Sequence, residues 1–215
     1  MEERFENKFI FSRGDEKNFR SLITNGFLRK LYENRVVNSI YYDTITLDNL
    51  YHNINGSNNR VKYRVRWYNQ INNSEVFFEK KIKSGLITKK KKISLGFFSS
   101  HFLLRKYLKS ENFLKKINTY TTQNLIEVLA VSYERAYFGD FEKKLRVTFD
   151  TKIKTQKRNM DTFFEIDSDI LELKYDLTES NFVKNKIKKT NFNLRNQKFS
   201  KYVRSFLLLS EMGFH

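Results

Sequence analysis

Residues 60–67 read Arg-Val-Lys-Tyr-Arg-Val-Arg-Trp, and this stretch decides the fold. Cations alternate with β-branched and aromatic residues, and a period of two predicts a β-strand with one charged face and one apolar face. Four cations follow one another on the charged face with no acid between them, so they repel one another. Either water or an anionic ligand must compensate this repulsion. The face is therefore solvated surface, or it lines a basic cavity.

Later segments repeat the pattern and favour the cavity. Arg146 alternates with apolar residues in 143–151, as Glu172 and Lys174 do in 170–175. Amphipathic helices are predicted over residues 15–32, 98–117, 179–189 and 200–212. These helices need apolar surface to cover, which strands provide if their apolar faces point outward. A β-sandwich would fit each strand equally well, but it leaves less apolar surface for the helices and does not explain the scarcity of acids on the charged faces.

The predicted fold is therefore α+β: an eight-stranded antiparallel β-barrel with a basic interior and helices on its outer face. Closing the sheet also removes its edges. Bringing many cations together inside is costly unless anions neutralise them. Residues 1–215 show no repeat or linker, so one domain is predicted.

Composition narrows the class of partner. The 215 residues carry 41 Lys and Arg against 24 Asp and Glu, a net charge of +17 that predicts a polyanionic partner: nucleic acid, polyphosphate or an anionic membrane surface. Hydrophobic residues make up 40%, which excludes wholesale disorder. The absence of Cys excludes disulfides and thiolate metal sites. No signal-like or membrane-spanning apolar run is present, so we expect a soluble cytoplasmic protein.

Eight short motifs occur in chain order: RFENKF from residue 4, SIYYDT from 39, RVRWY from 64, FEKK from 78, YERAY from 133, LRVTFD from 145, LELKY from 171 and FSKY from 199. Together they resemble the vacuolar transporter chaperone (VTC) domain, the polyphosphate polymerase branch of the CYTH-like triphosphate tunnel metalloenzymes. The resemblance implies an antiparallel tunnel that holds ATP, triphosphate or polyphosphate with Mn²⁺ or Mg²⁺. It also implies transfer of the γ-phosphate to a polyphosphate chain, with a membrane protein as a partner.

The resemblance also implies the site residues. Carried over by motif, the phosphate ligands are Lys8, Arg64, Arg66, Lys81, Arg135 and Arg146. Glu172 would hold the metal ion. Lys198 and Lys201, on one side of the last helix, would reach the tunnel mouth, and Ser200 would add a hydroxyl. The predicted catalytic residues are Arg64, Arg66, Lys81, Arg135, Arg146 and Lys201.

Two positions depend on a choice. In the run 89–92, Lys90 and Lys92 share one parity and the neighbouring lysines the other, and Lys90 is taken as the phosphate ligand. The wider superfamily often places two glutamates before its lysine, but here the first is Arg4. This departure leaves Glu6 as the ion-pair partner of a tunnel cation rather than a metal ligand.

Three functions share the predicted site: a polyphosphate polymerase, a hydrolase of tripolyphosphate or nucleoside triphosphates, and a non-catalytic polyphosphate-binding module. They differ in the acceptor, which the sequence does not show. A nucleic-acid binder is the rival from composition alone, since basic strands with Tyr and Trp can stack bases. The aromatic residues fall mostly on the face opposite the cations, which argues against a specific nucleic-acid ligand.

Overall fold

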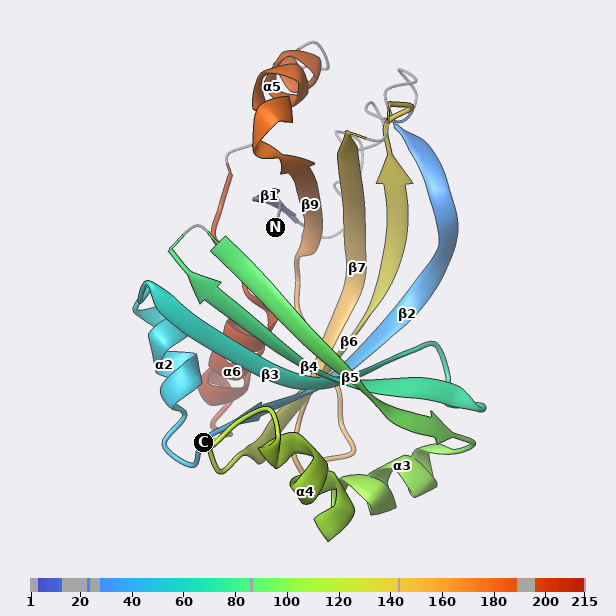
Figure 1. Cartoon of the computed structure of the whole chain (residues 1–215), viewed down its shortest axis with the longest axis vertical. Helices are drawn as coiled ribbons and strands as arrows, with labels where there is room; N and C mark the ends of the chain where they lie inside the picture. Colours follow the sequence, from blue (N-terminus) through green and yellow to red (C-terminus); the bar gives the residue numbers. More distant parts are fainter. Residues whose placement is uncertain are drawn as a thin grey trace. The chain divides into compact units, whose positions relative to one another are not determined.

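A computed structural model describes residues 4–12, 23, 28–85, 87–142, 144–188 and 196–214 (Figure 1). The fold is α+β, as predicted. Its strands are β1 (Arg4–Phe11), β2 (Arg29–Asp43), β3 (Asn59–Tyr68), β4 (Ser74–Ser84), β5 (Ile87–Phe98), β6 (Ile126–Gly139), β7 (Leu145–Lys157), β8 (Phe164–Glu165) and β9 (Asp169–Asp176). Its helices are α2 (Asp48–Ile54), α3 (His101–Leu108), α4 (Glu111–Asn118), α5 (Ser180–Lys188) and α6 (Lys201–Glu211), with a 3₁₀ turn at Leu177–Glu179.

The chain divides into two compact units. Unit 1 comprises Met1–Arg35, Tyr133–Ile153 and Glu165–Ser200, and unit 2 comprises Val36–Ser132, Lys154–Phe164 and Lys201–His215. Strands β2, β6 and β7 each contribute residues to both units. The assignment of the whole chain to one domain stays a prediction.

The strands pair in the order β1-β9-β7-β6-β2-β3-β4-β5, with β8 beside β7. Eight strands in succession were predicted, but the predicted closure is wrong for the described residues, because the path is open at β1 and β5. Each end has a local reason. The outer edge of β1 is occupied: Lys8 N donates to Asn196 Oδ1 and Lys8 O accepts from Gln197 N. The edge of β5 carries exposed lysines at residues 89–92, which oppose pairing with a further strand.

In unit 1, the apolar faces of β1, β7 and β9 form a core beneath α5. Phe9, Val147 and Leu171 pack together there with Val183 of α5, and each is at least 95% buried. Figure 1 shows α5 at the end of β9. The prediction that apolar strand faces lie beneath helices is confirmed in this unit.

In unit 2, the apolar face of β3 packs against α3 and α4, which lie below the strands in Figure 1. Val65 and Trp67 meet Phe78 of β4, Leu104 of α3 and Phe113 of α4 in one buried cluster. The rings of Phe78 and Phe113 meet edge to face with centroids 6.4 Å apart. The alternation in residues 60–67 therefore buries Val65 and Trp67 on one side and leaves the cations on the other.

Two predicted helices differ from those observed. Residues 29–32 were expected to end a helix but begin β2, where Tyr32 packs edge to face on Tyr137 at 5.9 Å; most of the predicted helix lies outside the described residues. Residues 98–117 form two helices, because Ser110 ends the first region and caps α4 by accepting from Phe113 N. None of the described helices is long and apolar enough to cross a membrane.

Candidate functional site

Several of the predicted phosphate ligands of unit 2 lie on one face of β3, β4 and β5. The register places Arg64 opposite Glu79 and Lys62 opposite Lys81. It also places Lys81 opposite Lys90 and Glu79 opposite Lys92. Since directly opposed residues in an antiparallel pair share a face, these side chains lie on the same side of the sheet. We call this side the cation face.

Glu79 is the centre of the cation face. Its Oε2 accepts from Arg64 Nε at 2.7 Å and lies 2.6 Å from Arg64 Nη2 and 3.5 Å from Arg66 Nη1. Its Oε1 lies 2.5 Å from Lys90 Nζ. Burial of Glu79 would raise its pKa, but Arg64, Arg66 and Lys90 lower it to about 2. A buried carboxylate thus holds three of the predicted phosphate ligands together.

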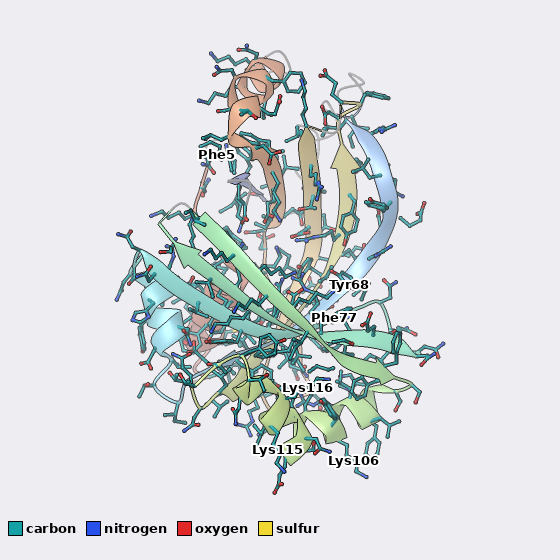
Figure 2. All side chains as sticks on the ribbon, in the orientation of Figure 1. Phe5, Tyr68, Phe77, Lys106, Lys115 and Lys116 are labelled. Atoms are coloured by element: carbon teal, nitrogen blue, oxygen red, sulfur yellow. The ribbon has the colours of Figure 1, made fainter. Side chains whose placement is uncertain are left out.

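The parity of the lysine run is now visible. Lys90 reaches Glu79, and Lys92 Nζ lies 3.3 Å from the ring centroid of Phe77, which is labelled in Figure 2. Both lysines share the cation face, and the choice of Lys90 as the phosphate ligand stays a prediction. Burial, together with repulsion from Arg64 and Arg66, lowers the pKa of Lys90 to about 8, although Glu79 acts in the opposite direction.

Helix α6 is fastened to β2 on the side of the sheet that carries the cations. The ring of Tyr202 stacks on Tyr41 with centroids 5.0 Å apart, and Tyr41 pairs with Arg64 across the strands. Tyr202 Oη donates to Asp43 Oδ2 at 2.7 Å. Lys201, the first residue of α6, therefore precedes a residue, Tyr202, that both contacts hold in place.

Unit 1 carries a second charged cluster. Lys8 Nζ lies 2.9 Å from Glu6 Oε1 and 3.6 Å from Glu172 Oε2, and Lys174 Nζ lies 2.5 Å from Glu172 Oε1. Burial would raise the pKa of Glu172, but Lys8, Lys174 and Arg135 hold it well below its usual range. Glu172 and Glu6 likewise raise the pKa of Lys8 against the effect of its burial. The expectation that Glu6 pairs with a cation is confirmed.

Arg135 belongs to the same cluster. It donates through Nε and Nη2 to the two carboxylate oxygens of Asp150 at 2.6 and 2.7 Å, and Asp150 is fully buried. Burial would lower the pKa of Arg135, but Tyr133 and Asp150 raise it. Arg146 is exposed on β7, on the same strand face as Thr148 and Asp150.

Lys198 and Ser200 are placed differently from the prediction. The final helix begins at Lys201, so Lys198 and Lys201 are not one helical turn apart. The reason is that residues 196–199 run beside β1, where Asn196 and Gln197 bond the Lys8 backbone and Phe199 O accepts from Lys8 Nζ at 3.1 Å. Residues 196–199 therefore cover the outer edge of β1 before α6 begins.

The carboxylates of unit 1 fit a divalent ion only in part. Within the described ranges, no group of three Asp, Glu, His or Cys side chains could hold a metal. Glu172 offers a hard oxygen ligand, and Thr148, its partner across β7 and β9, has a buried hydroxyl that makes no hydrogen bond to any residue that the structure describes. Mg²⁺ and Mn²⁺ accept such oxygens together with phosphate oxygens and water. The residues fit an ion that arrives with an anionic ligand.

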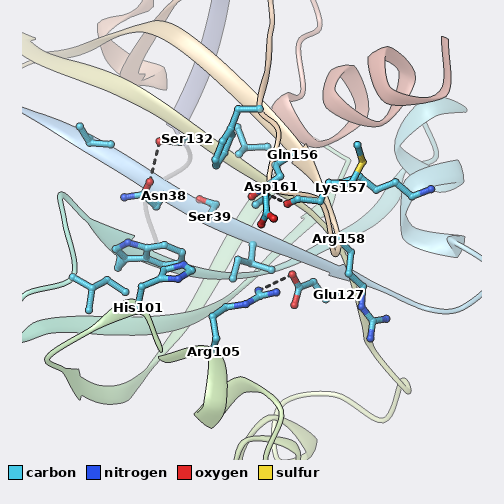
Figure 3. A pocket seen from close by; sticks show the side chains of 18 of the residues that line it. Asn38, Ser39, His101, Arg105, Glu127, Ser132, Gln156, Lys157, Arg158 and Asp161 are labelled. Carbon is cyan, nitrogen blue, oxygen red and sulfur yellow. Dashed lines mark hydrogen bonds and ion pairs between the residues drawn. The ribbon is translucent and has the colours of Figure 1, made fainter. Parts of the chain in front are cut away.

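A cavity of about 750 Å³ in unit 2 is lined by residues of β2, β3, β6, β7 and α3. Figure 3 shows His101 and Arg105 of α3 at its wall with Glu127 of β6. Arg105 Nη1 donates to Glu127 Oε1 at 2.7 Å, and burial beside Arg105 lowers the pKa of His101. The predicted site residues within the described part of the chain do not line it.

Sequence reasoning missed Glu79 and Asp150 as members of the site. Glu79 has the same parity as Lys81, and Asp150 the same parity as Arg146, so the alternation already placed both on charged faces. What the alternation lacked was the partner: opposition of Glu79 to Arg64 depends on the register of β3 and β4.

Known proteins agree with this architecture. The VTC domain family matches residues 3–210. A putative adenylate cyclase from Vibrio parahaemolyticus is 13% identical, with a TM-score of 0.55 over 95% of this chain and 98% of that one. A putative adenylyl cyclase from Hippeastrum, described as having a dominant triphosphatase activity, is 14% identical, with a TM-score of 0.54 over 94% and 96%.

A protein from Pyrococcus horikoshii shares the fold at 13% identity, with a TM-score of 0.52 over 96% of this chain and 99% of that one. A search of curated proteins found no match. At these identities the structural likeness shows the fold alone. The family match extends over nearly the whole sequence, and the chain therefore belongs to the VTC domain family.

Proposed function

We propose that this protein binds nucleoside triphosphate and polyphosphate through its charged strand faces and transfers the γ-phosphate to a polyphosphate chain. The observation that carries the proposal is the Glu79 cluster. Arg64, Arg66 and Lys90 converge on one buried carboxylate, so three cations already lie within ion-pair distance of one oxyanion. A phosphate oxygen offers the same charge and geometry.

The proposed phosphate ligands keep the roles that the family resemblance gives them. Arg64, Arg66, Lys81, Lys90 and Lys201 belong to unit 2, and Lys8, Arg135, Arg146, Lys198 and Ser200 belong to unit 1. Phosphoryl transfer requires positioning and charge stabilisation rather than a covalent intermediate on the protein. Rigid arginines supply both, because Glu79 and Asp150 fix their guanidinium planes. Of the proposed ligands, Arg64, Arg66, Lys81, Arg135, Arg146 and Lys201 take part in the transfer.

A divalent ion, Mn²⁺ or Mg²⁺, is proposed as the cofactor, with Glu172 as its protein ligand. The ion would neutralise charge on the transferred phosphate. Lys174 and Lys8 hold Glu172 ionised, so the carboxylate is ready to accept a cation without losing a proton first. Lys174 must move aside when the ion binds, since it lies 2.5 Å from Glu172 Oε1.

Hydrolysis of tripolyphosphate or nucleoside triphosphates is the second candidate. It is favoured by the triphosphatase activity named for the Hippeastrum protein of the same fold. The same ligands would hold the substrate, and water would replace the phosphate chain as acceptor. A specific nucleic-acid ligand is not proposed, because Tyr63 and Trp67 are buried beneath helices and cannot stack on bases. A membrane protein that receives the polymer is proposed as a partner.

Incubation with ATP or tripolyphosphate, with and without Mn²⁺, tests the proposal. Polymer formed from ATP supports the polymerase, and free phosphate without polymer supports the hydrolase. Tight tripolyphosphate binding without turnover would reduce the function to a binding module. If the protein shows neither turnover nor binding, the charged faces are excluded as a phosphate site.

A further inference from the structure

Two polar atoms on the cation face are buried and make no hydrogen bond among the described residues: Arg66 Nε and Ser39 Oγ. They belong to directly opposed residues of β2 and β3. Ser39 is 1% exposed and Arg66 5% exposed. Directly opposed side chains have Cβ atoms roughly 5 Å apart, so the two side chains start from neighbouring positions on the cation face.

Leaving such groups unmatched is costly, and folded proteins rarely do so without a reason. Both atoms are donors: a guanidinium Nε–H has no acceptor lone pair, and a serine hydroxyl can rotate toward an acceptor. The atom that satisfies them together must therefore be an acceptor, and the positive charge of Arg66 favours an anionic oxygen. Glu79 does not serve, because it meets Arg66 at Nη1 and not at Nε.

The pair lies at the buried end of the cation face. Side-chain exposure falls from 44% at Lys90 to 20% at Arg64 and 7% at Arg66. Beyond Arg66, Tyr68 pairs with Val37, which is fully buried. A linear polyanion that enters from the exposed end would place its leading phosphate at Arg66 and Ser39.

We propose that Ser39 Oγ and Arg66 Nε form a subsite for one non-bridging oxygen of the phosphate at the inner end of a bound triphosphate or polyphosphate. This inference rests on the proposed function and adds Ser39 to its phosphate ligands. An end phosphate carries three non-bridging oxygens and an interior one only two. One of them can therefore accept from Ser39 and Arg66 while the others meet the remaining guanidinium and ammonium groups.

The experiment compares Ser39→Ala with Ser132→Ala in the full chain. Ser132 Oγ already donates to Asn38 Oδ1 at 2.9 Å, and both serines border the cavity of unit 2, so the two hydroxyls differ in whether they have a partner. For each variant, the melting temperature without ligand and the tripolyphosphate affinity by calorimetry are measured. Ser39→Cys serves as a second variant that keeps the side-chain size and weakens the donor.

Ser39→Ala is expected to keep or raise the melting temperature without ligand, since it removes an unmatched hydroxyl. It should weaken tripolyphosphate binding by about tenfold or more, the effect of losing a hydrogen bond to a charged group. Ser39→Cys should weaken binding as well. Ser132→Ala should do the reverse, lowering the melting temperature and leaving the affinity unchanged.

Unchanged affinity in Ser39→Ala would overturn the subsite. If the same variant also melts at a lower temperature, the hydroxyl stabilises the free protein by bonding an internal water instead. Arg64→Ala separates this failure from a failure of the proposed function. If the wild-type chain binds tripolyphosphate and Arg64→Ala does not, the cation face stands and only the role of Ser39 is lost. If the wild-type chain does not bind, both proposals are lost.

Discussion

Tyr202 donates its hydroxyl proton to the carboxylate of Asp43, 159 residues earlier in the chain, across 2.7 Å. Asp43 is fully buried and also accepts from Asn49 N and Nδ2 and from Leu50 N at the start of α2. One carboxylate thus joins β2, α2 and α6. Because Tyr41 pairs with Arg64 and stacks on Tyr202, this junction also fixes the strand next to the proposed phosphate ligands.

Tyr202→Phe removes one of these bonds and keeps the ring stack on Tyr41. The other donors remain on Asp43, so we expect a loss of about 1–3 kcal/mol in the free energy of unfolding, measured in urea. Tyr51→Phe is the matched control, since Tyr51 is 52% exposed, and it should have no effect. Equal stability of the two variants would mean that the bond to Asp43 does not anchor α6.

Glu79→Gln removes the negative charge on which Arg64, Arg66 and Lys90 converge. Arg64 and Lys90 retain partial contact with water, so we expect a cost near the lower end of the range for a broken buried pair, about 3 kcal/mol. The pKa of Glu79 is about 2 in the folded protein against 4.5 ordinarily. A lowered pKa means that the stabilisation is complete above 4.5 and is lost as the pH falls toward 2.

The measurement for Glu79→Gln is therefore a series of unfolding curves from neutral pH downward. The difference between the wild-type and variant proteins should be constant above pH 4.5 and should shrink below it. Tripolyphosphate should raise the melting temperature of the variant more than that of the wild type, because it supplies the missing anion. A smaller rise in the variant would show that Glu79 orients the cations for the ligand instead of competing with it.

Lys90 should make the tripolyphosphate affinity of the proposed site sensitive to pH in the alkaline range. Its pKa of about 8 means that the free protein loses this cation as the pH rises through 8. A bound polyanion favours the charged form, so affinity for tripolyphosphate should fall above pH 8. Lys90→Arg should bind with a flatter pH profile. Lys91→Arg, on the opposite parity, should keep the wild-type profile, and identical profiles for all three proteins would exclude Lys90 as a ligand.

Much of the site follows from alternation alone. A period of two in residues 60–67 separates Arg64 and Arg66 from Val65 and Trp67, and the structure keeps this separation because Trp67 packs beneath α3 and α4. Local chemistry also predicts the turns: β3 ends before Asn69, which adopts a positive φ of 56° that asparagine tolerates, and Gly85 adopts 58° between β4 and β5.

What alternation does not contain is the identity of distant partners. The edge of β1 is covered by residues 196–199 through backbone bonds at Lys8, and a pattern of side chains carries no record of backbone bonds. For this reason closure of the strands was expected where the path is open. The pairing of Arg135 with Asp150 has the same origin, since it depends on how β6 and β7 align.

Asp150→Leu tests whether the buried pair of unit 1 stabilises the fold or positions a ligand. Alone it leaves Arg135 unpaired in a buried site, at a cost of about 3–5 kcal/mol. Combining it with Arg135→Met should recover much of that stability, because apolar groups of similar volume replace the pair. Tripolyphosphate affinity should stay low in the double variant. Restored affinity would exclude Arg135 as a phosphate ligand.

The division between binding and turnover is tested by Arg66→Ala and Glu172→Gln. Arg66 contacts Glu79 on the cation face and is proposed to bind phosphate directly, so Arg66→Ala should weaken tripolyphosphate binding with or without metal. Glu172→Gln keeps a neutral oxygen but loses the charge that would hold a divalent ion. It should retain metal-free binding and lose the dependence of turnover on Mn²⁺ concentration.

The metal-free affinity of Glu172→Gln separates two roles of this carboxylate. The substitution removes the negative charge that Lys8 and Lys174 share, which leaves more of their positive charge for an anionic ligand, although Lys8 keeps its ion pair with Glu6. The variant should therefore bind tripolyphosphate at least as tightly as the wild type when metal is absent, measured by calorimetry in the presence of a chelator. Weaker metal-free binding would mean that Glu172 holds Lys8 in place for the phosphate rather than holding the ion.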